Sequence, residues 1–470
     1  MWMVGLMACG GAPDGLGDTA TSGSTDLTLP SVPEIYEFTS RFSGESSVAY
    51  SGQAMRQVLM ADLAKHVGDL DARVSDGWVP EAGEVEAELN FYFDFDGLTS
   101  ADVPISTVTQ PASLQVTYGE ISTSANLVGK LAGNDSVGQH RDWSQGFDGF
   151  DTDGVVSPED LVRYWFSVLD ARAVARGSGV EEHGPDGEVL PVHLTPEGHD
   201  LQRLLANFLH GAISFSQTAD DYLDDDEPGK GLLSDHSEAD DGAPYTALEH
   251  AWDEGFGYFG GSRDFGLRGK AAVASSPVSD SMPTDAQTDL TREINWPMAV
   301  HASQRDVEAT VDQQFARTAW DAFIGGRHVL AESGGPLSDS EMVALRQFRD
   351  DAVGAYEAVF AATAVHYING VLVDMGRMGT DDYSFELHSA NWSEMKGMAL
   401  ALQFNSRSPM SDTDFVDLHA LLGMELVGST SDSAAQDAYK QDLIAARALL
   451  GSVYGFDETN LGGLDGSDGW

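Results

Sequence analysis

The stretch from Tyr245 to Phe259, YTALEHAWDEGFGYF, says more about the fold than any other part of the chain. It follows a turn-rich acidic loop ending in Gly-Ala-Pro, so a helix is predicted to begin at Tyr245 and Thr246. Positions i, i+3 and i+4 of a helix share one face, and here they are occupied by His250, Asp253 and Glu254. The apolar side is supplied by three aromatic residues, Trp252, Phe256 and Phe259. The stretch therefore predicts a buried helix with one titratable face.

A second helix is predicted around residues 391–397, NWSEMKG, and it repeats the Trp-x-Glu core of the first stretch. In the second copy Glu394 takes the place of Glu254. Two such helices, one in each half of a helical array, indicate a duplicated element.

The histidine and carboxylates of these helices suggest a metal site. Imidazole with carboxylates one turn away suits Fe, Mn or Zn when further helices add ligands. This hypothesis takes four residues as ligands: His250, Asp253, Glu254 and Glu394. In the alternative, His250 and Glu254 form a structural i,i+4 hydrogen-bonded pair buried beside Trp252. Both interpretations remain open at the level of sequence.

The composition is strongly acidic. In 470 residues, 76 Asp and Glu stand against 25 Lys and Arg, which gives a formal net charge of −51. Such a surface repels nucleic acid and anionic lipid headgroups and attracts cations, so no nucleic-acid partner is expected. It is typical of proteins that stay soluble in a salty or Ca²⁺-rich medium, where ions screen the self-repulsion.

The only cysteine, Cys9, follows Leu-Met-Ala and precedes a Gly/Ser/Thr/Asp-rich stretch. This pattern is similar to the lipobox of bacterial lipoproteins, although residues 1–7 contain no Lys or Arg. Residues 1–30 are therefore predicted to be a lipoprotein signal remnant and a flexible tether. Lipidation of Cys9 would anchor the protein to the outer membrane of a cell envelope, on its periplasmic or surface side.

A Ca²⁺-loop-like sequence, DGFDTDGVVSPED, spans residues 148–160. With Gly154 as the central glycine of such a loop, acidic residues fall at positions 3, 5 and 12, whereas position 1 is Gly149. The candidate ligands are Asp148, Asp151, Asp153 and Asp160. The alternative is a solvated acidic turn that caps the following helix, because Ser-Pro-Glu is a good helix start.

The rest of the chain predicts a mainly α fold, a helical bundle array with a mixed Gly-rich N-terminal insertion. The helical domain is assigned to residues 31–456, with the acidic Ca-loop-like insertion at 141–194, and residues 457–470 are predicted to be a disordered tail. Short extended segments are expected at 89–95 and 113–117. A helix is expected to start at Thr195-Pro196-Glu197, and a long helix to run from a capping box at 338–341 to about residue 375. The apolar run at 352–373 within it contains Glu, His and Asn, which favours a buried helix over a membrane span.

Six stretches between residues 36 and 423 carry a family resemblance. They are YEFTSRFSGESSVAYSGQAMRQVLMADL, GHDLQRLLANFLHGAISFSQTADDYL, YTALEHAWDEGFGYFGG, REINWPMAVHASQRDVEATVDQQFARTAWDAFIGGR, VHYINGVL and NWSEMKGMALALQFNSRSPMSDTDFVDLHALLG. The chain resembles the bacterial lipoprotein family known as domain of unknown function 4856. That family looks like a relative of the imelysin-type surface proteins, which implies an all-helical fold of two bundle-like halves and an association with iron acquisition. The imelysin motif Gly-x-His-x-x-Glu falls here on Leu248, His250 and Asp253, so two of its three residues differ.

The resemblance, together with Cys9, implies a cell-envelope lipoprotein that serves metal uptake, with iron as the metal, as a binding component. One alternative is an imelysin-type metallopeptidase with Glu254 as general base, which would need an open metal position and a water. Another is a surface interaction protein with only structural Ca²⁺. The sequence contains no HExxH, Gly-x-Ser-x-Gly or phosphate-binding glycine loop, and no catalytic residue is assigned. The expected ligands are Ca²⁺ and Fe or Zn, and the expected partners are the membrane, through the lipid, and another envelope protein.

Overall fold

The computed structural model describes residues 31–107, 109–135, 139–279 and 286–470. Over these residues the chain is 57% helical, with 15 α-helices and no strands, which confirms the predicted mainly α fold. The helices of the first half of the chain are α1 (Ser51–Ser75), α2 (Glu84–Phe93), α3 (Gly97–Ser100), α4 (Trp143–Gly146), α5 (Pro158–Gly177), α6 (Leu201–Leu209) and α7 (Ala247–Phe259). Those that follow are α8 (Lys270–Ser275), α9 (Pro297–Glu308), α10 (Phe315–Ser333), α11 (Asp339–Arg377), α12 (Phe385–Leu400), α13 (Asp412–Leu422), α14 (Ser433–Tyr454) and α15 (Glu458–Leu461).

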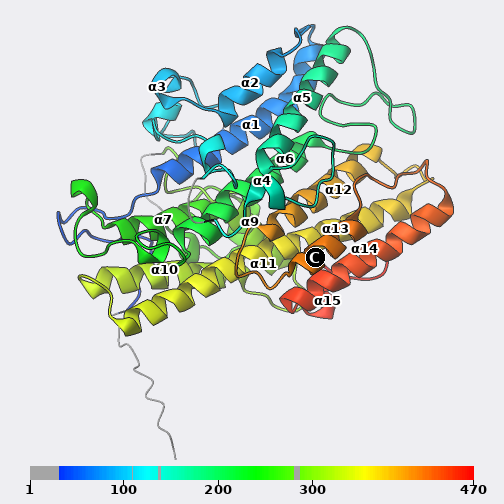
Figure 1. Ribbon diagram of the computed structural model, residues 1–470. Helices are drawn as coiled ribbons and strands as arrows, with labels where there is room; N and C mark the ends of the chain where they lie inside the picture. The colour runs from blue at the N-terminus through cyan, green and yellow to red at the C-terminus, as the bar shows by residue number, and fades with distance from the viewer. Residues whose placement is uncertain (1–30, 108, 136–138, 280–285) are drawn as a thin grey trace, which may run out of the picture.

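The long helix α11 connects the two ends of the molecule (Figure 1). It starts with the predicted capping box, in which Ser338 and Glu341 bond each other's backbone N–H groups. Its main partners are α10 on one side and α12 on the other, with α9 and α14 alongside. By length and composition α11 could cross a membrane, but 72% of its most apolar window is buried inside the protein. It is the central core helix that the polar residues in its apolar run predicted.

The helix α7 packs closely against α10 and the start of α1, where a tryptophan meets a glycine in one contact and a glycine meets a tyrosine in the other. Trp252 lies directly over Gly326 of α10 and donates from Nε1 to the Phe323 carbonyl at 2.8 Å. Gly257 lets the side chain of Tyr50 approach at the start of α1, and a Cβ there would lie 2.8 Å from the Cβ of Tyr50. This confirms the Tyr245–Phe259 stretch as a buried helix at the centre of its half of the molecule.

The regions predicted to be insertions are part of the same core. α1, α2 and α5 lie together at the top of Figure 1 and pack on one another. The segment 89–95, expected to be extended, is mostly the helix α2, because Val85, Leu89 and Phe93 recur every four residues and are all fully buried on one face. Residues 141–194 contribute α5, whose Trp165 and Phe166 are also fully buried. Neither region is a separate unit.

Two further boundaries differ from the predictions. The helix expected from Thr195 begins at Leu201, because Asp200 accepts hydrogen bonds from the N–H groups of Gln202 and Arg203 and so caps α6. Residues 113–117 form only isolated bridges, Ser113 with Thr288 and Thr117 with Pro104.

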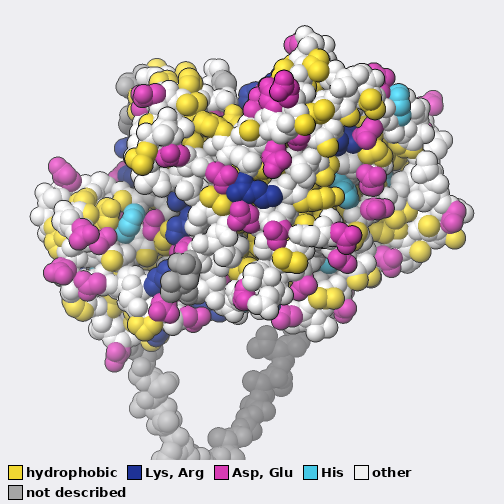
Figure 2. Space-filling model, turned by 45° about the horizontal axis from the view of Figure 1, so that its top comes forward, with side chains coloured by type: hydrophobic (Ala, Val, Ile, Leu, Met, Phe, Trp, Pro, Cys, Tyr) yellow, Lys and Arg dark blue, Asp and Glu magenta, His cyan; other side chains and the backbone are white. Residues whose placement is uncertain are grey.

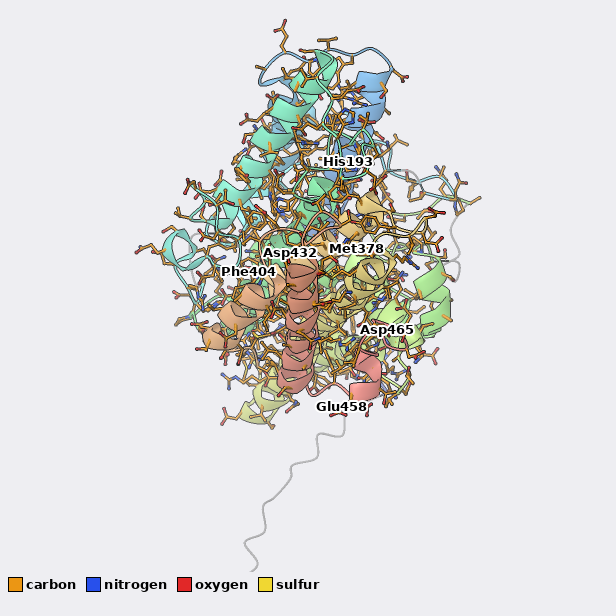
Figure 3. The ribbon with its side chains drawn as sticks, turned by 90° about the vertical axis from the view of Figure 1, so that its right-hand side faces the viewer. His193, Met378, Phe404, Asp432, Glu458 and Asp465 are labelled. Atoms are coloured by element: carbon orange, nitrogen blue, oxygen red, sulfur yellow. The ribbon has the colours of Figure 1, made fainter. Side chains whose placement is uncertain are left out.

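The C-terminal segment, expected to be a disordered tail, is packed on the helices instead. It forms α15, and the labelled Glu458 and Asp465 lie against the body of the protein in Figure 3. Trp470 is 4% exposed, donates from Nε1 to the Arg305 carbonyl at 2.9 Å, and packs on the rings of Phe315 and Phe456. The buried Trp470 side chain, together with hydrogen bonds such as that from Asn369 Nδ2 to the Trp470 carbonyl at 3.0 Å, holds a stretch that is otherwise rich in Gly and Asp.

We predict that Trp470→Ala lowers the free energy of unfolding by about 3–5 kcal/mol, because it empties a buried aromatic site. Leu464→Ala, in the same segment but at a position 77% exposed, should change it by less than about 0.5 kcal/mol. Urea unfolding followed by circular dichroism measures both. Equal, small effects of the two substitutions would restore the prediction of a loose tail.

Two short π-helical segments follow α6, and a buried carboxylate comes just after them. Residues His210–Phe215 and Thr218–Tyr222 are π-helical, a form that is rare outside functional or strained sites. Just beyond them Asp224 is 1% exposed, and neither of its carboxylate oxygens has a hydrogen-bond partner among the described residues. Burial, and secondarily the neighbouring carboxylates of Asp220 and Asp226, raise the pKa of Asp224 to about 7.

This raised pKa predicts a pH dependence of stability. The unfolded carboxyl group has a pKa of about 3.9, so the folded state holds its proton more tightly and loses stability as the pH rises from about 4 to about 7. Asp224→Asn mimics the protonated form and should stabilise the protein at pH 8, by at most about 4 kcal/mol, with little effect at pH 4. Urea unfolding at both pH values tests this, with the exposed Glu227→Gln as control. A destabilised Asp224→Asn protein at pH 8 would contradict it.

Candidate functional site

His250 and Glu254 lie in a polar pocket of about 250 Å³ between α7, the start of α1 and the loop of residues 122–130. The His250 imidazole and the Glu254 carboxylate are 3.7 Å apart, from Nε2 to Oε1. Their side chains are 31% and 17% exposed, so both are accessible from the pocket. The ring of Tyr245 stacks on the imidazole with its centroid 4.6 Å away.

The backbone sets the tautomer of His250. Its Nδ1 lies 3.0 Å from the carbonyl oxygen of Ala49, and because a carbonyl can only accept, Nδ1 carries the proton. In the neutral ring, Nε2 therefore keeps its lone pair and faces Glu254. On the other side Gln53 donates from Nε2 to Glu254 Oε1 at 2.7 Å and holds this carboxylate in place. This arrangement, a histidine oriented through its second nitrogen beside a fixed carboxylate, is common at metal sites.

Asp253, predicted to share this face, points away from the pocket. It is fully buried and accepts from Arg327 Nε at 2.9 Å, from the Tyr36 hydroxyl at 2.9 Å and from the Ala49 N–H at 3.1 Å. Burial raises the pKa of Asp253, and the positive charge of Arg327 opposes this effect. Arg327, itself 0% exposed, also donates to Glu249 at 2.9 Å. Asp253 is thus one member of a buried ionic network.

Glu394 belongs to a different part of the protein. It lies on α12 and is bonded by Arg203 and Asn207 of α6, and it does not line the pocket of His250. Among the described residues no group of three or more His, Cys, Asp or Glu is placed to hold a metal ion. The structure therefore brings His250 and Glu254 together but does not form the predicted site of four ligands, because α7 presents Asp253 to α10 and α12 presents Glu394 to α6.

The four predicted Ca²⁺ ligands do not form such a group either, within the part of the chain that the structure describes. Asp160 accepts from the Ser157 hydroxyl at 2.8 Å and from the Val156 N–H at 3.2 Å, at the start of α5. Asp151 and Asp153 are exposed, and the backbone of Asp148 bonds the Gln403 side chain. This geometry matches the alternative that the sequence left open, an acidic turn that caps a helix. The predicted lipidation site, Cys9, lies outside the described residues.

The sequence reasoning missed two cations of the pocket, Arg56 and Lys130. Lys130 is paired with Asp135 at 2.7 Å and lies 3.7 Å from Asp221. Arg56 is one turn into α1, 8% exposed, and donates from Nε to the Asn126 carbonyl at 2.7 Å. The sequence does contain one signal for Arg56: it is an arginine among the apolar residues of a predicted helix, one turn after Ser-Gly-Gln.

Comparison with known proteins gives one result. The family model described as Domain of unknown function (DUF4856) matches residues 172–417, more than half of the chain. The chain belongs to this family. No curated protein and no solved structure matches it. The segment shared with the DUF4856 family includes α7, α10 and α12, and hence His250, Glu254 and Arg327, whereas Gln53 and Arg56 of α1 precede it.

We predict that the Arg327 network is structural. Arg327→Met should leave two buried carboxylates without their partner and lower the free energy of unfolding by about 3–5 kcal/mol. Arg317→Met, on the same helix, removes a pair with Asp321 whose side chains are 63% and 49% exposed, and should cost no more than about 1 kcal/mol. Chemical denaturation measures both, and similar costs for the two variants would contradict the assignment.

Proposed function

We propose that this protein is a cell-envelope binding component for metal uptake, with iron as its cargo, and that His250 and Glu254 are its metal-binding residues. The observation that carries the proposal is the orientation of His250: the Ala49 carbonyl fixes the proton on Nδ1, and the free Nε2 faces the Glu254 carboxylate at 3.7 Å. Metal–ligand bonds to these atoms are about 2.0–2.2 Å long, so a single ion can contact both.

The donor set favours binding over hydrolysis. Catalytic zinc sites use three protein ligands and keep a fourth position for water. Here the pocket offers one imidazole and one carboxylate, and the carboxylate at the position of the imelysin glutamate, Asp253, is committed to Arg327. Glu254 would then be a ligand, which leaves no second carboxylate of α7 in the pocket to act as general base. Two protein ligands suit an ion that arrives with other ligands and later leaves.

The envelope location rests on other features. A lipid on Cys9 followed by a Gly/Ser/Thr-rich tether would hold the helical domain near the outer membrane. In Figure 2 acidic side chains are spread over the visible face, and Lys and Arg are fewer. A surface of this kind raises the local concentration of cations, which supports a role in their capture.

The test is metal binding by a His250→Gln variant. Gln keeps a polar side chain of similar length but is a poor ligand for borderline metals, so Zn²⁺ and anaerobic Fe²⁺ should bind at least about tenfold more weakly than to the parent. Isothermal titration calorimetry in the presence of excess Mg²⁺ removes nonspecific binding to the acidic surface.

The control is His183→Gln, which changes an exposed histidine outside the pocket and should bind metal like the parent. Equal affinity of the parent and His250→Gln for both metals would overturn the proposed site.

A further inference from the structure

The pocket of His250 has a second, positively charged corner at the start of α1. The residue before this helix, Tyr50, makes no side-chain cap, and its hydroxyl accepts from Arg263 Nε at 3.2 Å instead. The N–H groups of Ser51 and Gly52 have no acceptor among the described residues, and both residues line the pocket. The N-terminus of a 25-residue helix, with the partial positive charge of its dipole, therefore lies at the wall of the pocket.

The side chain of Arg56 points to the same corner. It is 8% exposed, yet within the described ranges it forms no ion pair with any carboxylate, although acidic residues outnumber basic ones threefold in this chain. Only Nε is bonded, to the Asn126 carbonyl. Nη1 lies so near Gly52 that a Cβ on this glycine would be 3.3 Å from it. The terminal nitrogens of Arg56 are thus not bonded to any carboxylate of the described residues, and they are available to an anion in the pocket next to the helix N-terminus.

The side-chain oxygen of the neighbouring Gln53 accepts no hydrogen bond. Gln53 is 1% exposed, and its Oε1 has no hydrogen-bond partner, whereas its Nε2 bonds Glu254. A ligand that satisfies this corner thus accepts hydrogen bonds from Arg56 and the α1 N-terminus and donates one to Gln53. Carboxylates match the planar guanidinium through two parallel hydrogen bonds, and a hydroxyl group supplies the donor.

We propose that this corner binds the carboxylate of a small hydroxycarboxylate, and that this chelator supplies the ligands that His250 and Glu254 leave open on the metal. The second clause rests on the proposed function; the first stands on Arg56, Gln53 and the α1 N-terminus alone. The pocket volume of about 250 Å³ is below the range for drug-sized ligands, which fits a molecule of this size. The pocket would thus bind a metal chelate, with the anion on α1 and the ion on α7.

The test is the binding of metal-free citrate to the whole protein at constant ionic strength, measured by calorimetry. Arg56→Gln should weaken citrate binding by at least about tenfold, and Arg317→Gln, which removes the same charge at an exposed position outside the pocket, should not change it. Circular dichroism and the melting temperature show whether the Arg56 variant folds.

Gly52→Ala is a second variant that does not depend on a buried charge. Gly52 has no positive φ, so alanine suits the helix and should keep or raise its stability, but the added methyl group obstructs the corner and should weaken citrate binding. Weaker binding in a variant that is as stable as the parent supports a binding site rather than a folding effect.

Citrate binding that is equal in the parent and in Arg56→Gln would overturn the proposal, and so would tighter binding of inorganic phosphate than of citrate by the parent. The citrate in this assay carries no metal, so its binding is measured separately from metal binding. His183→Gln, which lies outside the pocket, should bind metal-free citrate like the parent. Metal binding that depends on His250, without any citrate binding, would overturn the carboxylate corner and leave the proposed function in place.

Discussion

The buried guanidinium of Arg327 is the interaction on which the organisation of the site depends. It joins α10 to α7 through Asp253 and Glu249, and it donates to the Ser47 hydroxyl of the segment before α1 at 2.6 Å. A buried charge of this kind is tolerated only when its hydrogen bonds are made, so these three segments are held in one arrangement. As a consequence, Asp253 of α7 stabilises the fold, whereas His250 and Glu254 of the same helix line the pocket.

Glycine makes the close packing around α7 possible. Gly326 leaves room for the indole of Trp252, and Gly257 leaves room for Tyr50 and Gln53, so that the start of α1 lies against α7. The pocket exists because α1 begins there: its uncapped N-terminus forms one wall and the His250–Glu254 face forms the other. The two walls differ in chemistry, since one offers unpaired positive charge and the other an imidazole and a carboxylate. A ligand that carries both a cation and an anionic group satisfies both walls.

The second helix with a Trp-x-Glu core, α12, has different neighbours from α7. There α12 packs on α6 and α11, and Glu394, the counterpart of Glu254 in sequence, is taken up by Arg203 and Asn207. The duplicated Trp-x-Glu core thus occurs in two helices with different neighbours. In one the glutamate lines a pocket, and in the other it joins two helices. The resemblance of short helical motifs does not imply that they share a ligand.

Local sequence determined the helices themselves. The capping boxes at Thr246 and Ser338, the apolar spacing of α11 and the burial of the Tyr245–Phe259 stretch all follow from interactions within a few turns of chain. Periodicity also places His250, Asp253 and Glu254 on one broad face, but it cannot say which neighbour covers each residue. Only the tertiary structure decided that Asp253 meets Arg327, that Glu394 meets Arg203, and that Arg56 lines the pocket without a carboxylate partner among the described residues. The C-terminal segment could not be predicted for the same reason. The burial of Trp470 depends on Phe315, which is far away in the chain, and on Phe456, which belongs to no recognisable motif. Contacts between residues far apart in the chain carry no local pattern, and the composition of this pocket depends on such contacts.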